Sequence, residues 1–172
     1  ATGGFYDVVG GGFHRYSVDN AWMIPHFEKM LYNQAQLSLV YTRAYQLTQK
    51  PLYKRIAEQT LNYVLAELQD QNEGFTSATD ADSEGEEGTF FVWSANELKT
   101  ILIAEQFQLA SKWFDLSKHT EFEDKNVIRF YDVNQLQPSD YKAMDSLIST
   151  IYKARSQRIP PLTDDKVLLS WN

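Results

Sequence analysis

The stretch GGGFHRYSVDNAWMIPHFEKM, residues 10–30, places titratable and aromatic side chains behind three consecutive glycines. Large apolar groups mixed with ionisable ones are typical of a ligand pocket. Its two histidines, His14 and His26, are the candidates for moving a proton, although single histidines often serve as hydrogen-bonded structural groups. A helix is expected to begin at His26, and the positive potential of a helix start would favour the neutral imidazole as a base.

A second chemistry-bearing stretch is the acidic motif DADSEGEEG, in which Asp80, Asp82 and Glu84 alternate before Gly85. This spacing imitates the start of a calcium-binding EF-hand loop. Counted from Asp80, however, the twelfth position is Phe91, where such a loop needs a bidentate carboxylate. A pocket-lining role, a solvated acidic turn and calcium binding remain as interpretations, and the first is favoured. We also predict that this motif and residues 10–30 lie at the same end of the helices.

Several further side chains are candidates for binding a ligand. Glu28 and Tyr32 fall four residues apart and form one line on a helix. Gln34 lies on an apolar face, so its amide must find partners or face a polar cavity. Trp22 and Trp93 neighbour the charged motifs, and flat rings beside carboxylates and amides suit carbohydrate, although they also occur at structural corners. Lys29 has two readings, an ion pair near Glu28 or a solvated surface charge.

The elements that must position these groups are mostly helical. Apolar residues recur with helical spacing over 26–47 and from Pro51 to about Gln69, which predicts two long helices joined as an αα-hairpin. The segment GTFFVW reads as a strand, paired with GFTSA across the acidic turn. Ser94 and Glu97 form a capping box for the next helix. Two more helices are expected over Glu105–Phe114 and Ser139–Arg155.

Composition limits the classes of function. The 172 residues are 43% apolar and 14% aromatic, enough for one domain or part of a larger one. Sixteen basic against 23 acidic residues give a net charge of −7, which disfavours nucleic acid and anionic lipid as partners. The absence of cysteine removes disulfides and thiol chemistry. With neither a transmembrane run nor a signal peptide in the sequence, we expect a cytoplasmic protein, and we expect no metal or cofactor.

Three segments together resemble a known family: GGFYDVVGGGFHRYSVDNAWMIPHFEKMLYNQAQL, SATDADSEGEEGTFFVW and TDDKVLLSWN. They are similar to signatures of the YyaL-type, spermatogenesis-associated, thioredoxin-domain-containing family. The resemblance implies an all-α fold with a small β-hairpin, in which αα-hairpin repeats form part of an (α/α)6 toroid like that of N-acylglucosamine 2-epimerases and six-hairpin glycosidases. Twelve helices need about 300 residues. Residues 1–172 are therefore expected to be a single partial domain, about half of a toroid, with the family's thioredoxin-like domain before Ala1.

The same resemblance implies a sugar as the small-molecule partner. Epimerase-like relatives move a proton with paired histidines, whereas hydrolase-like relatives use a carboxylic acid and a base around water. The residues implied as catalytic are His14, His26 and Asp82. Those implied as substrate-binding are Arg15, Tyr16, Trp22, Glu28, Lys29, Tyr32, Gln34, Asp80 and Trp93.

The alternative is a non-catalytic binding or scaffold module that accompanies the thioredoxin-like domain. An enzyme should bring His14, His26 and Asp82 around one concavity. The chain departs from the family at Asn33, Thr79 and Leu169, where we associate the family with Asp, Glu and Thr. Half a toroid should also leave apolar surface open, so we expect self-association with Leu39, Val40 and residues 168–169 at the uncovered edge.

Overall fold

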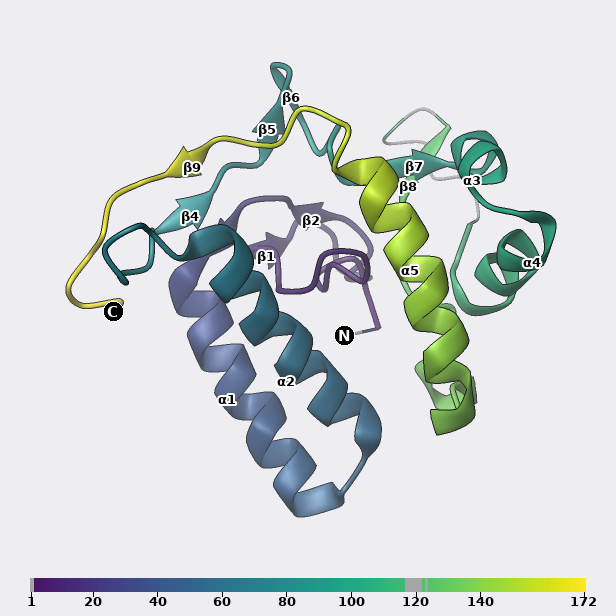
Figure 1. Cartoon of the computed structure of the whole chain (residues 1–172), viewed down its shortest axis with the longest axis horizontal. Coiled ribbons are helices and arrows are strands. Elements are labelled where there is room, and N and C mark those ends of the chain that lie inside the picture. Colours follow the sequence, from purple (N-terminus) through teal and green to yellow (C-terminus); the bar gives the residue numbers. More distant parts are fainter. Residues whose placement is uncertain (1, 117–121, 123) are drawn as a thin grey trace.

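The computed structural model describes residues 2–116, 122 and 124–172. Helices make up most of the regular structure, and short strands lie along one end of them (Figure 1). The helices comprise the hairpin α1–α2 and a second group, α3 to α5. Within the described residues, each helix is too short or too polar to cross a membrane.

The predicted αα-hairpin is present. Helix α1 spans Leu31–Thr48, and α2 spans Pro51–Tyr63 and continues into a π-helical turn, η1, at Val64–Leu68. Pro51 occupies the first turn of α2, where its missing N–H costs nothing. The connection is tight because Gln49 adopts a left-handed conformation with φ 56°.

The first helix begins five residues later than predicted, because residues 25–30 are extended. Strand β2 (Pro25–His26) pairs with β1 (Tyr16–Ser17), and β3 (Lys29–Met30) pairs with β4 (Ala78–Thr79). Strand pairing satisfies the backbone groups of this segment, so its helical spacing of apolar residues does not decide its conformation. His26 is therefore a strand residue and lies at no helix start.

The predicted pairing of GTFFVW with GFTSA is wrong. Strand β7 (Val92–Ser94) pairs with β8 (Lys125–Val127), and β4 pairs with both β3 and β9 (Thr163–Asp164). The acidic motif instead closes on itself, with β5 (Asp82–Ser83) against β6 (Glu86–Glu87). Glu84 and Gly85 at its tip have φ values of 57° and 84°, as a type I′ hairpin turn requires.

The second helical group builds the main core. Helix α3 (Ala95–Ile101) starts with the predicted capping box of Ser94 and Glu97, and α4 (Ala104–Trp113) follows. Two short 3-10 turns, Val133–Gln135 and Pro138–Asp140, precede α5 (Tyr141–Arg155). The buried face of α5 packs against α3, α4 and the N-terminal loop in one apolar cluster, whose members include Tyr6, Phe13, Leu98, Trp113, Met144, Leu147 and Ile151.

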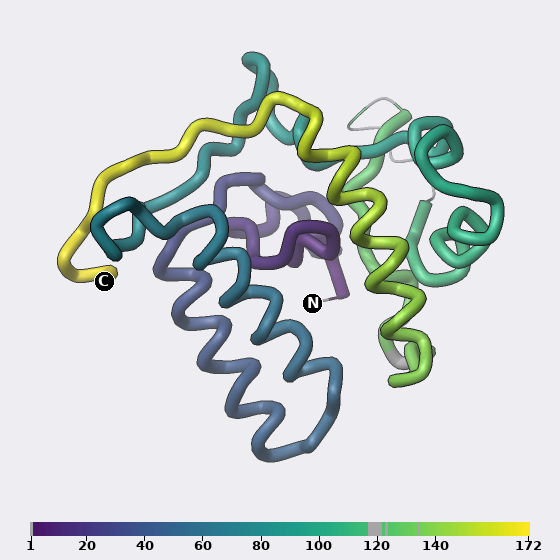
Figure 2. The backbone as a smooth tube through the Cα atoms, viewed as in Figure 1, coloured from purple at the N-terminus to yellow at the C-terminus, as the bar shows by residue number. Residues whose placement is uncertain are grey.

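The C-terminal segment returns to the first hairpin. After α5 the chain runs past β4 to the strand-bearing end of α1 and α2 (Figure 2). There Trp171 packs its ring edge-on against Tyr32, and the Asn172 side-chain amide bonds to the backbone of Phe75. The last residues thus tie the two helical groups together at the same end as the strands.

Candidate functional site

The two motifs predicted to lie together do so. His26 Nδ1 is 2.6 Å from Glu87 Oε1 of the acidic motif, and the backbone N–H of Phe27 donates to the same oxygen at 3.2 Å. Strand β3 of the first motif also pairs with β4, directly before the acidic residues. This confirms that residues 10–30 and the acidic motif share one end of the helices.

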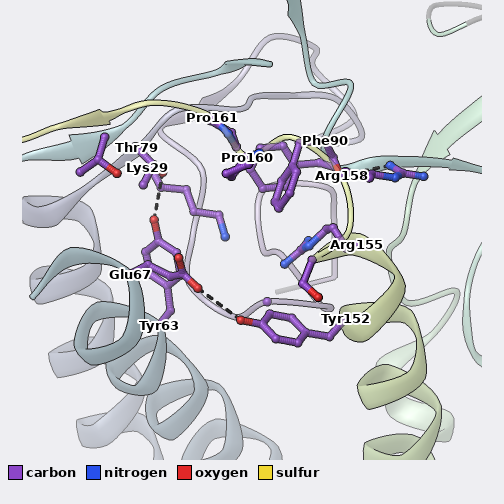
Figure 3. Close-up of a pocket in the computed structure, with 14 residues that line it drawn as sticks. Lys29, Tyr63, Glu67, Thr79, Phe90, Tyr152, Arg155, Arg158, Pro160 and Pro161 are labelled. Carbon is purple, nitrogen blue, oxygen red and sulfur yellow. Dashed lines mark hydrogen bonds between the residues drawn. The ribbon is translucent and has the colours of Figure 1, made fainter. Parts of the chain in front are cut away.

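A pocket of about 300 Å³ lies at this end, between the end of the α1–α2 hairpin and the end of α5 (Figure 3). The N-terminal loop, η1, the acidic motif's flanks and the segment after α5 all contribute to it. Lys29 is the one predicted site residue among the side chains that line it. The lining residues are Gly10, Lys29, Tyr63, Glu67, Thr79, Phe90, Phe91, Tyr152, Arg155, Ser156, Arg158, Pro160, Pro161 and Thr163.

Two buried cations, Lys29 and Arg155, line the inner wall of the pocket and share the buried carboxylate of Asp7 behind them. Lys29 Nζ donates to Asp7 Oδ2 at 2.7 Å, and Arg155 Nη1 donates to Asp7 Oδ1 at 3.0 Å. The backbone N–H groups of Val9 and Gly10 also donate to Asp7. Burial by itself would raise the pKa of Asp7, but Arg155 and then Lys29 hold it well below its usual range.

The sequence predicts that Lys29 is paired near Glu28 or solvated, and both predictions are wrong. The residue is buried, with 1% of its surface exposed. Besides Asp7 its ammonium donates to Gly11 O at 2.8 Å and lies 4.2 Å from the centre of the Tyr63 ring. Burial lowers the pKa of Lys29 to about 8, against the opposing effect of Asp7. The ammonium is therefore mostly charged at neutral pH.

Arg155 has donors to spare. Its guanidinium is 4% exposed, and Asp7 is its one hydrogen-bond partner among the described residues. Nε is buried and has no hydrogen-bond partner in that part of the chain. The rings of Phe90, Phe91 and Tyr152 lie 5.2 to 5.8 Å from the guanidinium carbon and hold its plane in place.

The outer part of the pocket carries hydroxyl and carboxylate groups (Figure 3). Tyr152 donates its hydroxyl to Glu67 at 3.2 Å, and the Tyr63 hydroxyl is 3.0 Å from Thr79 Oγ1. Glu67 is exposed and belongs to η1, a π-helical turn of the kind often found at functional sites.

Arg158 lies at the far side of the pocket, and its guanidinium already has protein hydrogen-bond partners. Its guanidinium donates to the carbonyls of Thr89, Phe90 and Val92 and pairs with Glu97 at 3.2 Å. It also lies 3.7 Å from the centre of the Trp93 ring, which is 4% exposed.

His14 lies in the core, outside the pocket. Its ring is 1% exposed, bonds through Nδ1 to Phe27 O at 2.8 Å and meets the rings of Phe27 and Phe91 edge-on. Burial, aided by the charge of Lys29, lowers the pKa of His14 to about 3. A neutral ring that donates to a carbonyl secures the turn from Phe13 to Phe27.

His26 belongs to a surface cluster instead. Beyond its contact with Glu87, its Nε2 lies 3.4 Å from Glu28, which pairs with Arg15 at 2.7 Å. The ring of Tyr16 packs against His26 with centroids 4.9 Å apart. Asp82 is exposed and faces Glu87 across the β5–β6 hairpin. The structure thus brings His26 near the hairpin that carries Asp82, while neither lines the pocket.

The remaining predicted binding residues are dispersed. Gln34 is fully buried and its amide bonds to the N–H and the carbonyl of Phe13, which fixes the N-terminal loop on α1. Trp22 is 56% exposed and meets Phe5 edge-on, and Asp80 accepts from the N–H of Ala81. Tyr32 packs against Trp171.

Sequence reasoning missed most of the pocket. Arg155 had a usable signal, since it follows Met144, Ile148 and Ile151 along the buried face of α5, where an unpaired charge is costly. Asp7 precedes the glycines and had no comparable pattern around it. Glu67 and Tyr152 come from helices far apart in the sequence, and only packing brings them together.

Comparisons with known proteins place the chain among a small group of relatives. No family model matches it. Spermatogenesis-associated protein 20 is 37% identical in Mus musculus and 35% in Homo sapiens over 205 aligned positions, covering 100% of this chain and 26% of those proteins. An uncharacterized protein of Caenorhabditis elegans is 32% identical and covers 99% of the chain, which is 28% of that relative.

Among solved structures, a glycoside hydrolase is weakly similar. The crystal structure of a family 76 glycoside hydrolase from a bovine Bacteroides thetaiotaomicron strain gives a TM-score of 0.39 at 16% identity, covering 90% of this chain and 36% of that one. The sequence relatives are much nearer. The chain spans about a quarter of the length of these curated relatives, and over its full length it is similar to one segment of spermatogenesis-associated protein 20.

Proposed function

We propose that the chain is a segment of a protein of the spermatogenesis-associated, thioredoxin-domain-containing family, and that its helical hairpins are part of an (α/α)6 toroid with a ligand site at the strand-bearing end. The similarity to spermatogenesis-associated protein 20 along the whole chain supports the family. The αα-hairpin, the second helical group and the strands gathered at one end support the architecture.

The function that the geometry supports best is binding of a sugar in the pocket. The observation that carries this is the convergence of aromatic rings, from Tyr63, Phe90 and Tyr152, with hydrogen-bonding groups, from Glu67 and Arg155. A sugar presents apolar ring faces and a rim of hydroxyls, so it needs both kinds of partner. A volume of about 300 Å³ lies at the low end for ligand pockets, which fits one or two sugar rings.

Titration of this chain with a panel of monosaccharides and disaccharides, followed by saturation-transfer NMR and calorimetry, tests the proposal. Tyr152→Ala removes a ring from the pocket and should weaken binding about tenfold. Tyr131→Ala is the matched control, because Tyr131 is 71% exposed and lies outside the pocket. Absence of binding throughout the panel, or equal losses in the two variants, would refute a sugar site here.

The second candidate is acid/base chemistry by His26, on a sugar bound at its surface cluster with Glu28 and Glu87 rather than in the pocket. Its contact with Glu87 orients the ring, as a carboxylate does for many catalytic histidines, and leaves Nε2 near Glu28. His26→Gln should then abolish turnover of a sugar that binds, with the circular dichroism spectrum unchanged. Full turnover in that variant would reassign the base.

The placement of His14, His26 and Asp82 supports the alternative function, a module that binds a ligand without turnover. His14 is enclosed in the core, and the other two lie on the surface outside the pocket. Ligand binding with no epimerised or hydrolysed product, measured by NMR over hours at high protein concentration, would favour this binding or scaffold role.

A further inference from the structure

We propose that the ligand of this pocket carries an anionic group, a carboxylate or a phosphate, and that Arg155 and Lys29 bind it at the inner wall. This inference rests on the sugar site proposed above and names the class of sugar. Its starting point is the balance of buried charge, since two cations, each under 5% exposed, share the single carboxylate of Asp7. A buried positive excess favours an anion.

The unused donors make the same point in terms of hydrogen bonds. A guanidinium has five N–H donors, and among the described residues that of Arg155 bonds to Asp7 alone. Its Nε–H is buried without a partner in that part of the chain, and an unpaired buried donor costs free energy that an acceptor would recover. Figure 3 shows the nitrogens of Lys29 and Arg155 directed toward each other, where both donate to Asp7, with Glu67 and Tyr152 below them.

The neighbouring charges set the orientation of the ligand. Behind the cations lie Asp7 and the neutral ring of His14, and Arg158 is held by Glu97 and three carbonyls. Glu67 is the facing carboxylate on the outer side of the pocket. It would repel an anion nearby but accept hydrogen bonds from sugar hydroxyls. The ligand should therefore point its anionic group at Arg155 and its hydroxyls at Glu67.

Calorimetry of the chain with D-glucuronate, glucose 6-phosphate and methyl glucoside tests this. At least one of the two anionic sugars should bind about tenfold more tightly than methyl glucoside at low salt, and added salt should reduce the difference. The stronger of the two identifies a carboxylate or a phosphate as the group recognised. Arg155→Lys keeps a cation beside Asp7 but removes the guanidinium N–H groups that would bind the anion. The preference of the pocket for anionic sugars should therefore largely disappear.

A second variant decides the matter if Arg155→Lys fails to fold. Glu67→Gln removes the opposing carboxylate and should raise the ratio of anionic to neutral affinity severalfold. Glu58→Gln removes the same charge from the exposed face of α2, outside the pocket, and should leave that ratio as it is. Equal affinity for all three sugars would overturn this inference and leave the sugar site standing, whereas no binding of any sugar would overturn both.

Discussion

At the scale of single residues, the buried group formed by Asp7, Lys29 and Arg155 joins the N-terminal loop, β3 and the end of α5. Asp7→Asn would leave two buried cations without their counter-charge, so we expect the free energy of unfolding to fall by about 3–5 kcal/mol. Urea unfolding followed by tryptophan fluorescence measures this. Asp165→Asn, at an exposed position, should change it by less than about 0.5 kcal/mol. A similar small loss in both variants would contradict a structural role for Asp7.

His14 should make stability depend on pH. The unfolded chain takes up a proton on this residue near pH 6.5, whereas burial lowers the pKa of native His14 to about 3. Between these values the unfolded state binds more protons, so stability should fall as the pH drops, by up to about 1.4 kcal/mol per pH unit. His14→Gln should flatten this slope, because glutamine does not titrate in this range. Its amide can still donate to Phe27 O, which should keep the fold.

The control for this titration is His26→Gln. His26 is partly exposed at the surface, so the variant should keep the slope that His14 causes. Urea unfolding at several pH values between about 4.5 and 6.5 gives the comparison. Equal slopes in wild type and His14→Gln would show that His14 is not the group responsible.

At the scale of elements, the β5–β6 hairpin offers a matched pair of glycines. Gly85 and Gly88 both have positive φ, 84° and 79°, so alanine is strained at either position. A Cβ at Gly85 would meet open space, whereas one at Gly88 would collide with the ring of Phe27. We expect Gly85→Ala to cost about 1 kcal/mol and Gly88→Ala to cost about 2–4 kcal/mol, since overpacking adds to the backbone strain. Thermal unfolding distinguishes them, and equal costs would mean that Phe27 can move aside.

At the scale of the whole molecule, the first hairpin leaves apolar surface uncovered. Leu39 and Val40 on α1 are 52% and 57% exposed, and Leu169 near the C-terminus is 94% exposed. Exposed apolar patches favour association, so we expect this chain to self-associate at high concentration. The double variant Leu39→Glu and Val40→Lys should lower the average mass seen by light scattering. Ile103→Lys, an exposed apolar position on another face of the fold, is its control, and a wild type that stays monomeric would remove the expectation.

Local signals in the sequence were enough for the helices. The apolar spacing of α1, α2 and α5, Pro51 in the first turn of α2 and the capping box at Ser94 all follow from interactions within a few residues, and the structure bears them out. The sequence motifs also predicted that residues 10–30 and the acidic turn lie at one end of the helices, and the structure confirms it. These features depend on periodicity and capping, which a linear sequence records directly.

Strand pairing and the pocket depended on the tertiary structure. Residues 26–30 carry a helical pattern, yet β4 supplies backbone partners for the extended strand β3 from about 50 residues away, and β9 pairs with the other edge of β4. The pocket likewise needs Asp7, Lys29 and Arg155 to meet. No spacing along the chain predicts the contact between Asp7 and Arg155, which are 148 residues apart. The sequence by itself therefore determined where the helices lie, apart from the start of α1, and which residue types carry charge. Only the tertiary structure decided that His14 is enclosed and that Lys29 and Arg155 face a cavity, because burial and electrostatic pairing are properties of the packed chain.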